Sequence, residues 1–270
     1  GGGVLSAVVD EFVNLHCGNH TIPALIEACG NPHAISVNFQ FFANAGVEEY
    51  EDRPVIAQFS RSHNPDIWCG EFAIEVKSLI RKDFPLQYYG AHRPSFNTNK
   101  VGKQRPAWTD GSGRPVPPKF LVAANSRRIR KFPAAGARKL ATLNHYALRS
   151  LDSYLVKNDR GDVNREHRAF DDTYWRERND IAHEDRSIQG YLPSVEKEIA
   201  RLKAIPGVWT LHEEACGLHR AKRDALLAQP AYRAMKDQLK AAGTICPAEE
   251  ALLTSLGLPL PPSPYREIVR

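Results

Sequence analysis

The sequence predicts an α/β protein in which a sheet is followed by a C-terminal helical region. An apolar run at residues 4–9 is typical of a buried strand, and it ends in two carboxylates, Asp10 and Glu11. Segment 33–42 is rich in β-branched and aromatic residues, which favour strands, and segment 140–148 is also expected to be a strand. From about residue 192 onward, apolar side chains recur at helical spacing. Strands early in the chain and helices late in it indicate this order of layers.

Helix boundaries are predicted from capping residues and breakers. Thr21 is suited to cap a helix that has Pro23 in its first turn and ends near Gly30. Ser150 is suited to cap a second helix. Residues 55–59 and 73–80 fit either a strand or a short helix. Four later helices are predicted, one starting near Pro193 and ending before Gly207, one over residues 211–226, one after Pro230 and one over 247–256.

Residues 83–138 are predicted to be irregular because proline and glycine recur throughout this stretch. A loop-rich segment of this length inside a compact domain is usually functional, because binding residues are often carried by loops that a rigid scaffold holds in position. The alternative is a surface excursion without a binding role.

Composition excludes several classes of protein. The chain has 270 residues, 42% of them hydrophobic and 25% charged, with a net charge of +5 and a pI near 8.9. This mild positive charge does not favour a dedicated nucleic-acid binder, and no nucleic-acid partner is expected. No apolar stretch approaches the roughly 18 residues of a membrane span, and no secretory signal opens the chain. We therefore expect a cytoplasmic protein, with the inner face of the membrane as an alternative location.

The five cysteines lie at positions 17, 29, 69, 216 and 246. Their odd number and the lack of a Cys-x-x-Cys pair disfavour a disulfide framework or a zinc ribbon, and favour a reducing compartment. His16 and His20 lie near Cys17, but without a cysteine pair we do not expect zinc there.

The acid pair at the end of the first apolar run is the main candidate for chemistry. Ligands of open α/β sheets bind at the carboxyl ends of the strands, and carboxylates suit Mg²⁺ or Mn²⁺. Asp10 is therefore a candidate metal ligand, and the alternative is that it only caps a turn. His145 lies near the end of another predicted strand, and its imidazole is either a second ligand or a satisfied structural histidine.

Residues 8–16, Val-Val-Asp-Glu-Phe-Val-Asn-Leu-His, resemble the Asp-x-Asp-Glu-Phe segment of family 2-like glycosyltransferases of the GT-A type. The resemblance runs over roughly residues 4–230 and is specific as an ordered set of segments. The further segments, in family order, are residues 38–44, 51–54, 90–94, 110–115, 143–150 and 154–162.

The resemblance implies a partial GT-A (nucleotide-diphospho-sugar transferase) sheet over residues 1–165, a helical region over 166–258 and a proline-rich tail over 259–270. It gives Asp10 the place of the last Asp-x-Asp acid, which binds the metal, and His145 the place of a late histidine that completes the metal site. Val8 stands where the family has the first acid. The family also carries a nucleotide-binding half before this strand, which we expect to be missing here.

The function implied by the resemblance is transfer of a sugar from a nucleotide-sugar donor to a glycan or lipid-linked acceptor. The reaction would depend on Mn²⁺ or Mg²⁺ and serve bacterial surface polysaccharide synthesis. The alternative is a truncated or inactive glycosyltransferase-like protein that acts as a binding module, which Val8 favours. A nucleic-acid-binding module is a third reading, which the mild charge disfavours.

Five further residues are candidates on chemical grounds. His92 and Arg93 follow Gly90, and an arginine there can grip a phosphate, although a structural turn fits as well. An acceptor hydroxyl needs a general base, for which Glu11, Glu71 and Asp110 are the candidates. Asp110 also opens a glycine-containing turn, which is its alternative role.

Aromatic and cationic residues after residue 145 suit sugar stacking and phosphate contact. The candidates are Tyr146, Lys157 and Trp175, with core packing as the alternative for Trp175. The basic run at 127–139 suits an anionic acceptor or peripheral contact with a membrane, and otherwise is solvated charge.

Overall fold

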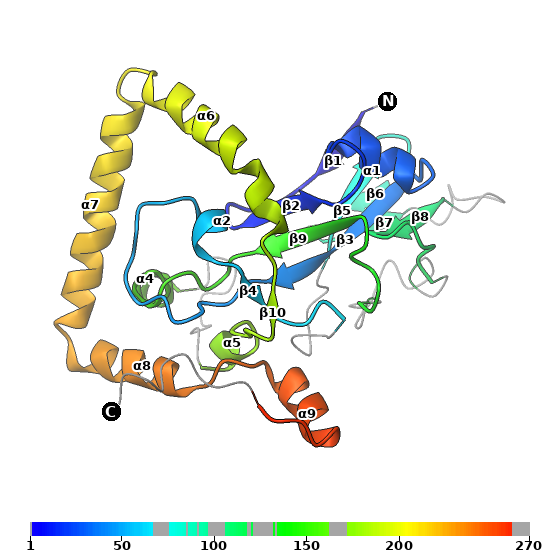
Figure 1. Ribbon diagram of the computed structural model, residues 1–270. Coiled ribbons are helices and arrows are strands. Elements are labelled where there is room, and N and C mark those ends of the chain that lie inside the picture. The colour runs from blue at the N-terminus through cyan, green and yellow to red at the C-terminus, as the bar shows by residue number, and fades with distance from the viewer. Residues whose placement is uncertain are drawn as a thin grey trace. The chain divides into compact units, whose positions relative to one another are not determined.

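The computed structural model describes residues 2–66, 76–84, 86–90, 92–96, 106–117, 120, 132, 134–161 and 172–260. The chain is a mixed α/β protein with a curled mixed sheet and C-terminal helices (Figure 1). It forms two compact units, with Gly1–Gln40 and Pro65–His145 in unit 1 and Phe41–Asn64 and Tyr146–Arg270 in unit 2. The chain therefore passes between the units three times, and residue 165, the predicted boundary, lies inside unit 2.

The sheet of unit 1 has the strand order β1-β5-β3-β9-β2, with β8 also paired to β3. The pairs β1–β5, β5–β3 and β9–β2 are antiparallel, whereas β8–β3 is parallel. The sheet thus joins strands from the start, middle and end of the unit. The strands are β1 (Gly3–Leu5), β2 (Glu11–Leu15), β3 (Ala34–Phe41), β5 (Val76–Arg81), β8 (Trp108–Asp110) and β9 (Ala141–His145).

The prediction of a buried strand over residues 4–9 is wrong. Strand β1 ends at Leu5, and the side chains beyond it are uncovered, with Val8 54% and Val9 94% exposed. A turn follows, in which the Glu11 amide donates to the Val8 carbonyl (3.0 Å). Asp10 therefore precedes strand β2 and Glu11 is its first residue, so the acids begin a strand instead of ending one. An apolar run is buried only where another part of the protein covers it. Strand β1 is short and lies at the edge of the sheet, so the residues after it are left uncovered.

Helix α1 (Ile22–Ala28) confirms the predicted cap, because the Thr21 hydroxyl accepts the Ala24 amide (3.4 Å). The predicted strand at 33–42 is confirmed as β3, and that at 140–148 is confirmed in part, as β9 over Ala141–His145. The stretch 83–138 is not wholly irregular, since it holds β8 and an antiparallel hairpin of β6 (Leu86–Tyr89) and β7 (Pro94–Phe96).

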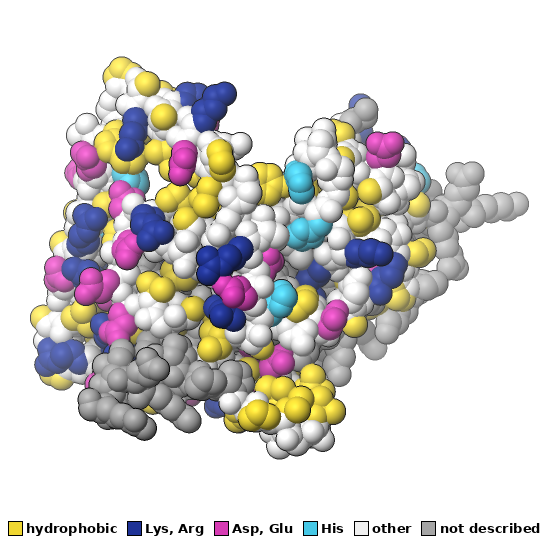
Figure 2. Space-filling view, in the orientation of Figure 1, with side chains coloured by type: hydrophobic (Ala, Val, Ile, Leu, Met, Phe, Trp, Pro, Cys, Tyr) yellow, Lys and Arg dark blue, Asp and Glu magenta, His cyan; other side chains and the backbone are white. Residues whose placement is uncertain are grey.

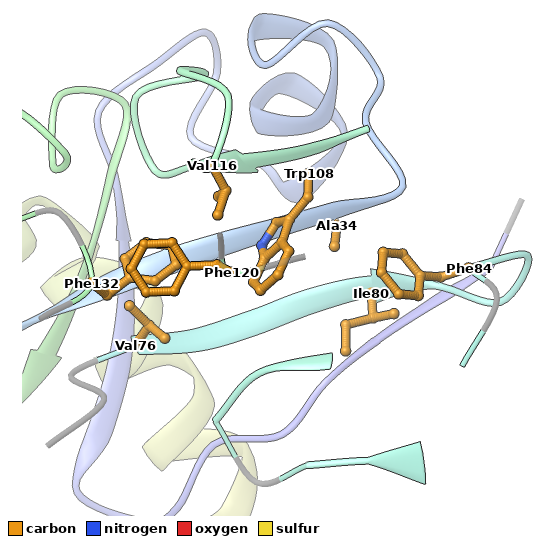
Figure 3. Close-up of a cluster of buried hydrophobic side chains, with 8 residues drawn as sticks. All are labelled: Ala34, Val76, Ile80, Phe84, Trp108, Val116, Phe120 and Phe132. Atoms are coloured by element: carbon orange, nitrogen blue, oxygen red, sulfur yellow. The ribbon is translucent and has the colours of Figure 1, made fainter. Parts of the chain in front are cut away.

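An aromatic core packs on this sheet (Figure 3). Phe120 and Phe132 have ring centroids 5.2 Å apart, and Trp108 lies 6.2 Å from Phe132. The Trp108 indole donates to the Ser36 hydroxyl (2.9 Å), which satisfies its polar atom inside the core. The cluster comprises Ala34, Val76, Ile80, Phe84, Trp108, Val116, Phe120 and Phe132.

Unit 2 is mainly helical. Helix α4 begins where predicted, because the Ser150 hydroxyl accepts the Ser153 amide (3.2 Å). Gly207, with φ of 81°, separates α6 from α7 as predicted. A two-stranded sheet pairs β4 (Arg61–Ser62) with β10 (His183–Glu184). The helices are α2 (Val55–Gln58), α4 (Leu151–Arg160), α5 (Asp172–Arg176), the 3-10 helix η2 (Ser187–Tyr191), α6 (Leu192–Lys203), α7 (Val208–Leu227), α8 (Pro230–Ala241) and α9 (Pro247–Ser255).

Charge on the helices of unit 2 is mixed. Over α7, Figure 2 shows acidic and basic side chains interspersed instead of gathered into one basic patch. Within the described parts of the chain, no helix combines the length and apolar character that crossing a membrane requires. The last ten residues, 261–270, lie outside the described residues, so the predicted extended tail has no structural counterpart here.

Candidate metal site at the start of strand β2

Antiparallel pairing of β2 with β9 brings the predicted metal ligands together. The register sets Glu11 opposite His145, so Asp10, one residue earlier, lies beside the end of β9. The Asp10 Oδ2 and His145 Nε2 atoms are 3.7 Å apart, and the two side chains are 20% and 13% exposed. A carboxylate and an imidazole thus meet in a mostly desolvated place.

This spacing is compatible with one divalent ion between the two side chains. Ligand atoms about 2.1 Å from an octahedral ion are about 3.0 Å apart when adjacent and about 4.2 Å apart when opposite. The distance of 3.7 Å exceeds the adjacent spacing by about 0.7 Å, so the two side chains would move slightly closer to bind one ion as adjacent ligands. Mg²⁺ prefers oxygen ligands only, whereas Mn²⁺ also accepts imidazole nitrogen, so the pair suits Mn²⁺ better. No third His, Cys, Asp or Glu completes a cluster with this pair among the described residues.

Phe39 contacts His145 and also a second imidazole, that of His92. The Phe39 ring makes edge contacts with both imidazoles, at centroid distances of 5.0 Å to His145 and 6.1 Å to His92. His92 Nδ1 lies 3.2 Å from the Val76 carbonyl oxygen, which can only accept, so Nδ1 carries the proton. Desolvation of the ring, and then the charge of Lys77, lower the pKa of His92. His92 is therefore neutral at pH 7.

Glu11 forms a buried ion pair with Lys77. The Glu11 Oε2 to Lys77 Nζ distance is 3.5 Å, and the side chains are only 4% and 6% exposed. The same oxygen accepts the Val8 amide (3.1 Å), which ties down the turn that carries Asp10. Glu11 thus supports the turn, and a catalytic role for it stays a prediction. Lys77, a cation between apolar and small residues near the start of β5, is the signal that sequence reasoning missed.

The Asp110 carboxylate is fully engaged in its own turn. Its Oδ1 accepts the amides of Ser112 (2.8 Å) and Arg114 (3.1 Å), and its Oδ2 accepts Arg114 Nε (2.8 Å). The side chain is 5% exposed. This arrangement is the turn that the sequence offered as the alternative to a catalytic base. Glu71, another predicted base, lies outside the described residues.

The predicted substrate residues are distributed over both units. Arg93 lies in unit 1, where burial lowers the pKa of its guanidinium. A Cβ at Gly90 would lie 2.6 Å from the Arg93 carbonyl oxygen, so glycine is required for this turn. Tyr146 and Trp175, in unit 2, have no exposed surface. Tyr146 stacks on Phe42 (4.7 Å), which makes packing the role of its ring.

Lys157 is also engaged within unit 2. Its Nζ donates to the Ala147 carbonyl (2.8 Å) and the Tyr174 hydroxyl (3.1 Å). Trp175 packs edge-on against Tyr154, with ring centroids 4.8 Å apart. These two predicted substrate residues therefore help to hold the helical core.

The basic run at 127–139 falls partly outside the described residues, which omit 127–131 and 133. Arg138 is buried, and its Nε donates to the Phe39 carbonyl (2.9 Å). Arg138 therefore supports strand β3, whereas Lys139 is exposed, and contact of the run with an acceptor or a membrane stays a prediction. The rings of His16 and His20 hydrogen-bond to the Thr142 hydroxyl (3.2 Å) and the Leu15 carbonyl (2.6 Å).

Comparisons of the chain with protein-family models, with curated proteins and with solved structures find no match.

Proposed function

We propose that this protein is a metal-dependent glycosyltransferase that moves a sugar from a nucleotide-sugar donor to a glycan or lipid-linked acceptor. The observation that carries the proposal is the approach of Asp10 to His145, at 3.7 Å, through the β2–β9 pairing. These are the two residues that the resemblance to GT-A glycosyltransferases selects as metal ligands. We further propose that unit 1 is a partial sheet of that fold and that Mn²⁺ is the preferred ion.

A bound divalent ion would act as a Lewis acid and neutralise the diphosphate that leaves the sugar. The residues of this chain would hold and orient the participants. Asp10 and His145 would be the ligands, and the Glu11–Lys77 pair would keep the turn at Asp10 rigid. Phe39 would fix the plane of the His145 ring through its edge contact.

His92 is suited to contact a substrate hydroxyl. Because its Nδ1 is used by the Val76 carbonyl, the lone pair of Nε2 is the remaining acceptor. The lowered pKa keeps this nitrogen neutral, so it can accept a hydrogen bond from a sugar at pH 7. This supports the substrate-binding role predicted for His92 and gives it a specific atom.

Asp10→Asn tests the proposal by isothermal titration of the full chain with Mn²⁺, alone and with nucleoside diphosphate sugars. We expect the substitution to weaken Mn²⁺ binding at least about 100-fold, because loss of a ligand costs more than the 10–100-fold of a supporting contact. Asp83→Asn is the matched control, since Asp83 is an exposed acid of unit 1 paired with Arg81. Equal Mn²⁺ affinity in the Asp10→Asn and unsubstituted proteins would contradict the metal site.

Donor turnover separates the enzyme from the alternative binding module. Release of sugar from a nucleoside diphosphate sugar, dependent on Mn²⁺, supports the transferase. Binding of Mn²⁺ and donor without turnover supports an inactive glycosyltransferase-like protein, which Val8 favours. In that case Val8→Asp supplies the acid that the resemblance expects, and turnover restored by it would trace the inactivity to this one position.

A further inference from the structure

A second group of metal-ligand side chains lies in unit 2. Asp52, His212 and Cys216 each offer one ligand atom, and these three atoms lie within 4.8 Å of one another. Helix α7 supplies His212 and Cys216, whose spacing of four residues sets them on one face of the helix. Asp52 comes from the loop between β3 and α2, which runs beside α7 (Figure 1).

The three ligand atoms converge on one point. His212 Nε2 lies 3.0 and 2.9 Å from the two Asp52 carboxylate oxygens and 3.6 Å from Cys216 Sγ. In a catalytic relay, the carboxylate and the nucleophile occupy opposite nitrogens of the imidazole. Here both are at the same nitrogen, so the arrangement is not a relay. Convergence of an oxygen, a nitrogen and a sulfur atom is instead the geometry of shared coordination.

The distances fit a tetrahedral zinc ion. With Zn–N and Zn–O bonds of about 2.0–2.1 Å and a Zn–S bond of about 2.3 Å, the N···O edge is about 3.3 Å and the N···S edge about 3.5 Å. The observed distance of 3.6 Å between His212 Nε2 and Cys216 Sγ matches the N···S edge. The observed N···O distance of 2.9 Å is about 0.4 Å shorter than the N···O edge, so the Asp52 oxygen would have to move away from His212 by that amount. A small rotation of the Asp52 side chain provides this movement, because that side chain is 39% exposed.

We propose that Asp52, His212 and Cys216 bind one Zn²⁺ ion, with water as the fourth ligand. The thiolate of Cys216 selects zinc over Mn²⁺ and Mg²⁺, which prefer oxygen. The side chains of Asp52 and His212 are 39% and 37% exposed, which leaves room for the ion to enter and for the water ligand. Zinc binds the thiolate form of cysteine, so binding would release the Cys216 thiol proton and affinity falls as pH falls.

Neighbouring side chains hold the ligands in place. The Trp209 ring lies 4.4 Å from that of His212, and the Tyr50 hydroxyl is 3.2 Å from Cys216 Sγ. Tyr50 in turn packs against His219 at 4.4 Å. Such supporting contacts fix the orientation of metal ligands before the ion arrives. Zinc would thereby clamp the 50–52 segment to α7 within unit 2.

The test is titration of the chelator-treated full chain with Zn²⁺, for the unsubstituted protein and for Cys216→Ala and His212→Ala. We expect one Zn²⁺ per chain and a loss of affinity of at least about 100-fold in each variant. Cys17→Ala and His183→Ala are matched controls that retain the three ligands, and they should bind as the unsubstituted protein does. Zinc should also raise the Tm of the unsubstituted protein but not that of the two ligand variants.

Co²⁺ gives a readout that needs no substitution. Its complex with the unsubstituted protein should show thiolate-to-metal charge transfer and the strong visible bands of tetrahedral coordination. No Zn²⁺ binding, equal affinity in Cys216→Ala, or a Co²⁺ complex without the thiolate band would overturn the proposal. Asp10→Asn should leave Zn²⁺ binding unchanged. The zinc proposal can therefore be tested independently of the proposed transferase.

Discussion

The two units each hold a carboxylate beside an imidazole, but in different settings. In unit 1, Asp10 and His145 are 3.7 Å apart, 20% and 13% exposed, and supported by a buried ion pair. In unit 2, Asp52 Oδ2 and His212 Nε2 are 2.9 Å apart, and the two side chains are 39% and 37% exposed. The Cys216 thiol is a third group, with its Sγ 3.6 Å from the same nitrogen. The distance of 3.7 Å in unit 1 is too long for a hydrogen bond, whereas the distance of 2.9 Å in unit 2 is that of a hydrogen bond with good geometry.

The difference shows that the neighbouring groups and the solvent exposure of a carboxylate–imidazole pair decide which metal ion the pair can bind. Without a thiol and with little solvent, the pair in unit 1 suits a hard ion that brings substrate oxygens with it. With a thiolate and open solvent access, the pair in unit 2 suits zinc. The sheet of unit 1 fixes its ligands through strand pairing, while unit 2 uses one turn of a helix and a loop.

The largest effect is expected from Lys77→Met. Removing this lysine leaves the Glu11 carboxylate buried without its partner, which costs about 3–5 kcal/mol of unfolding free energy. Breaking the exposed pair of unit 2 by Asp52→Asn, without added metal, should cost only about 0–1 kcal/mol. Urea unfolding of the two variants, with chelator present, measures both.

Adding Glu11→Gln to Lys77→Met should restore part of the loss, because the buried charge is removed while an acceptor for the Val8 amide remains. If Lys77→Met costs no more than Asp52→Asn, the picture of a rigid, buried support beneath Asp10 is wrong.

An intermediate effect is expected at the helix caps of the two units. Ser150→Ala removes a buried cap at the start of α4 and should cost about 1–2 kcal/mol. Thr21→Ala removes an exposed cap with a longer bond, 3.4 Å, and should cost about 0.5 kcal/mol. Thermal unfolding of each variant gives the comparison. A larger loss for Thr21→Ala would mean that unit 1 depends on its helix as much as unit 2 does.

The smallest effect is expected on the pH dependence of stability. Burial is the main cause that lowers the pKa values of His92 in unit 1 and His219 in unit 2. The unfolded chain therefore binds more protons than the folded one as pH falls below about 6.5, and stability is lost in that range. His92→Gln and His219→Gln should each make stability less dependent on pH between about 5 and 7.5. An unchanged slope in Tm against pH for both variants would contradict the burial of these rings.

The helices were largely predictable from the sequence. Thr21 and Ser150 cap α1 and α4 as predicted, and Gly207 separates α6 from α7. These signals succeed because capping and chain breaking act within one turn of the chain, where sequence neighbours are also spatial neighbours. Strand β3 was predictable from its β-branched and aromatic residues for the same local reason.

The candidate site was predictable in part. The resemblance selects Asp10 and His145 together, and the β2–β9 register accounts for their closeness. Their role as ligands stays a prediction. The setting of Asp10 was predicted wrongly, since the apolar run before it is exposed and the acids open a strand.

By itself, the sequence determined the helices, the main strands and the identity of the chemical groups, because these depend on nearby residues and on side-chain type. Only the tertiary structure decided which distant groups meet: Glu11 with Lys77, and Asp52 with His212 and Cys216. Such meetings depend on strand register and helix placement, which follow from burying surface across the whole unit. The spacing of His212 and Cys216 sets these two on one face of α7, but no pattern within one segment encodes their meeting with Asp52 or that of Glu11 with Lys77.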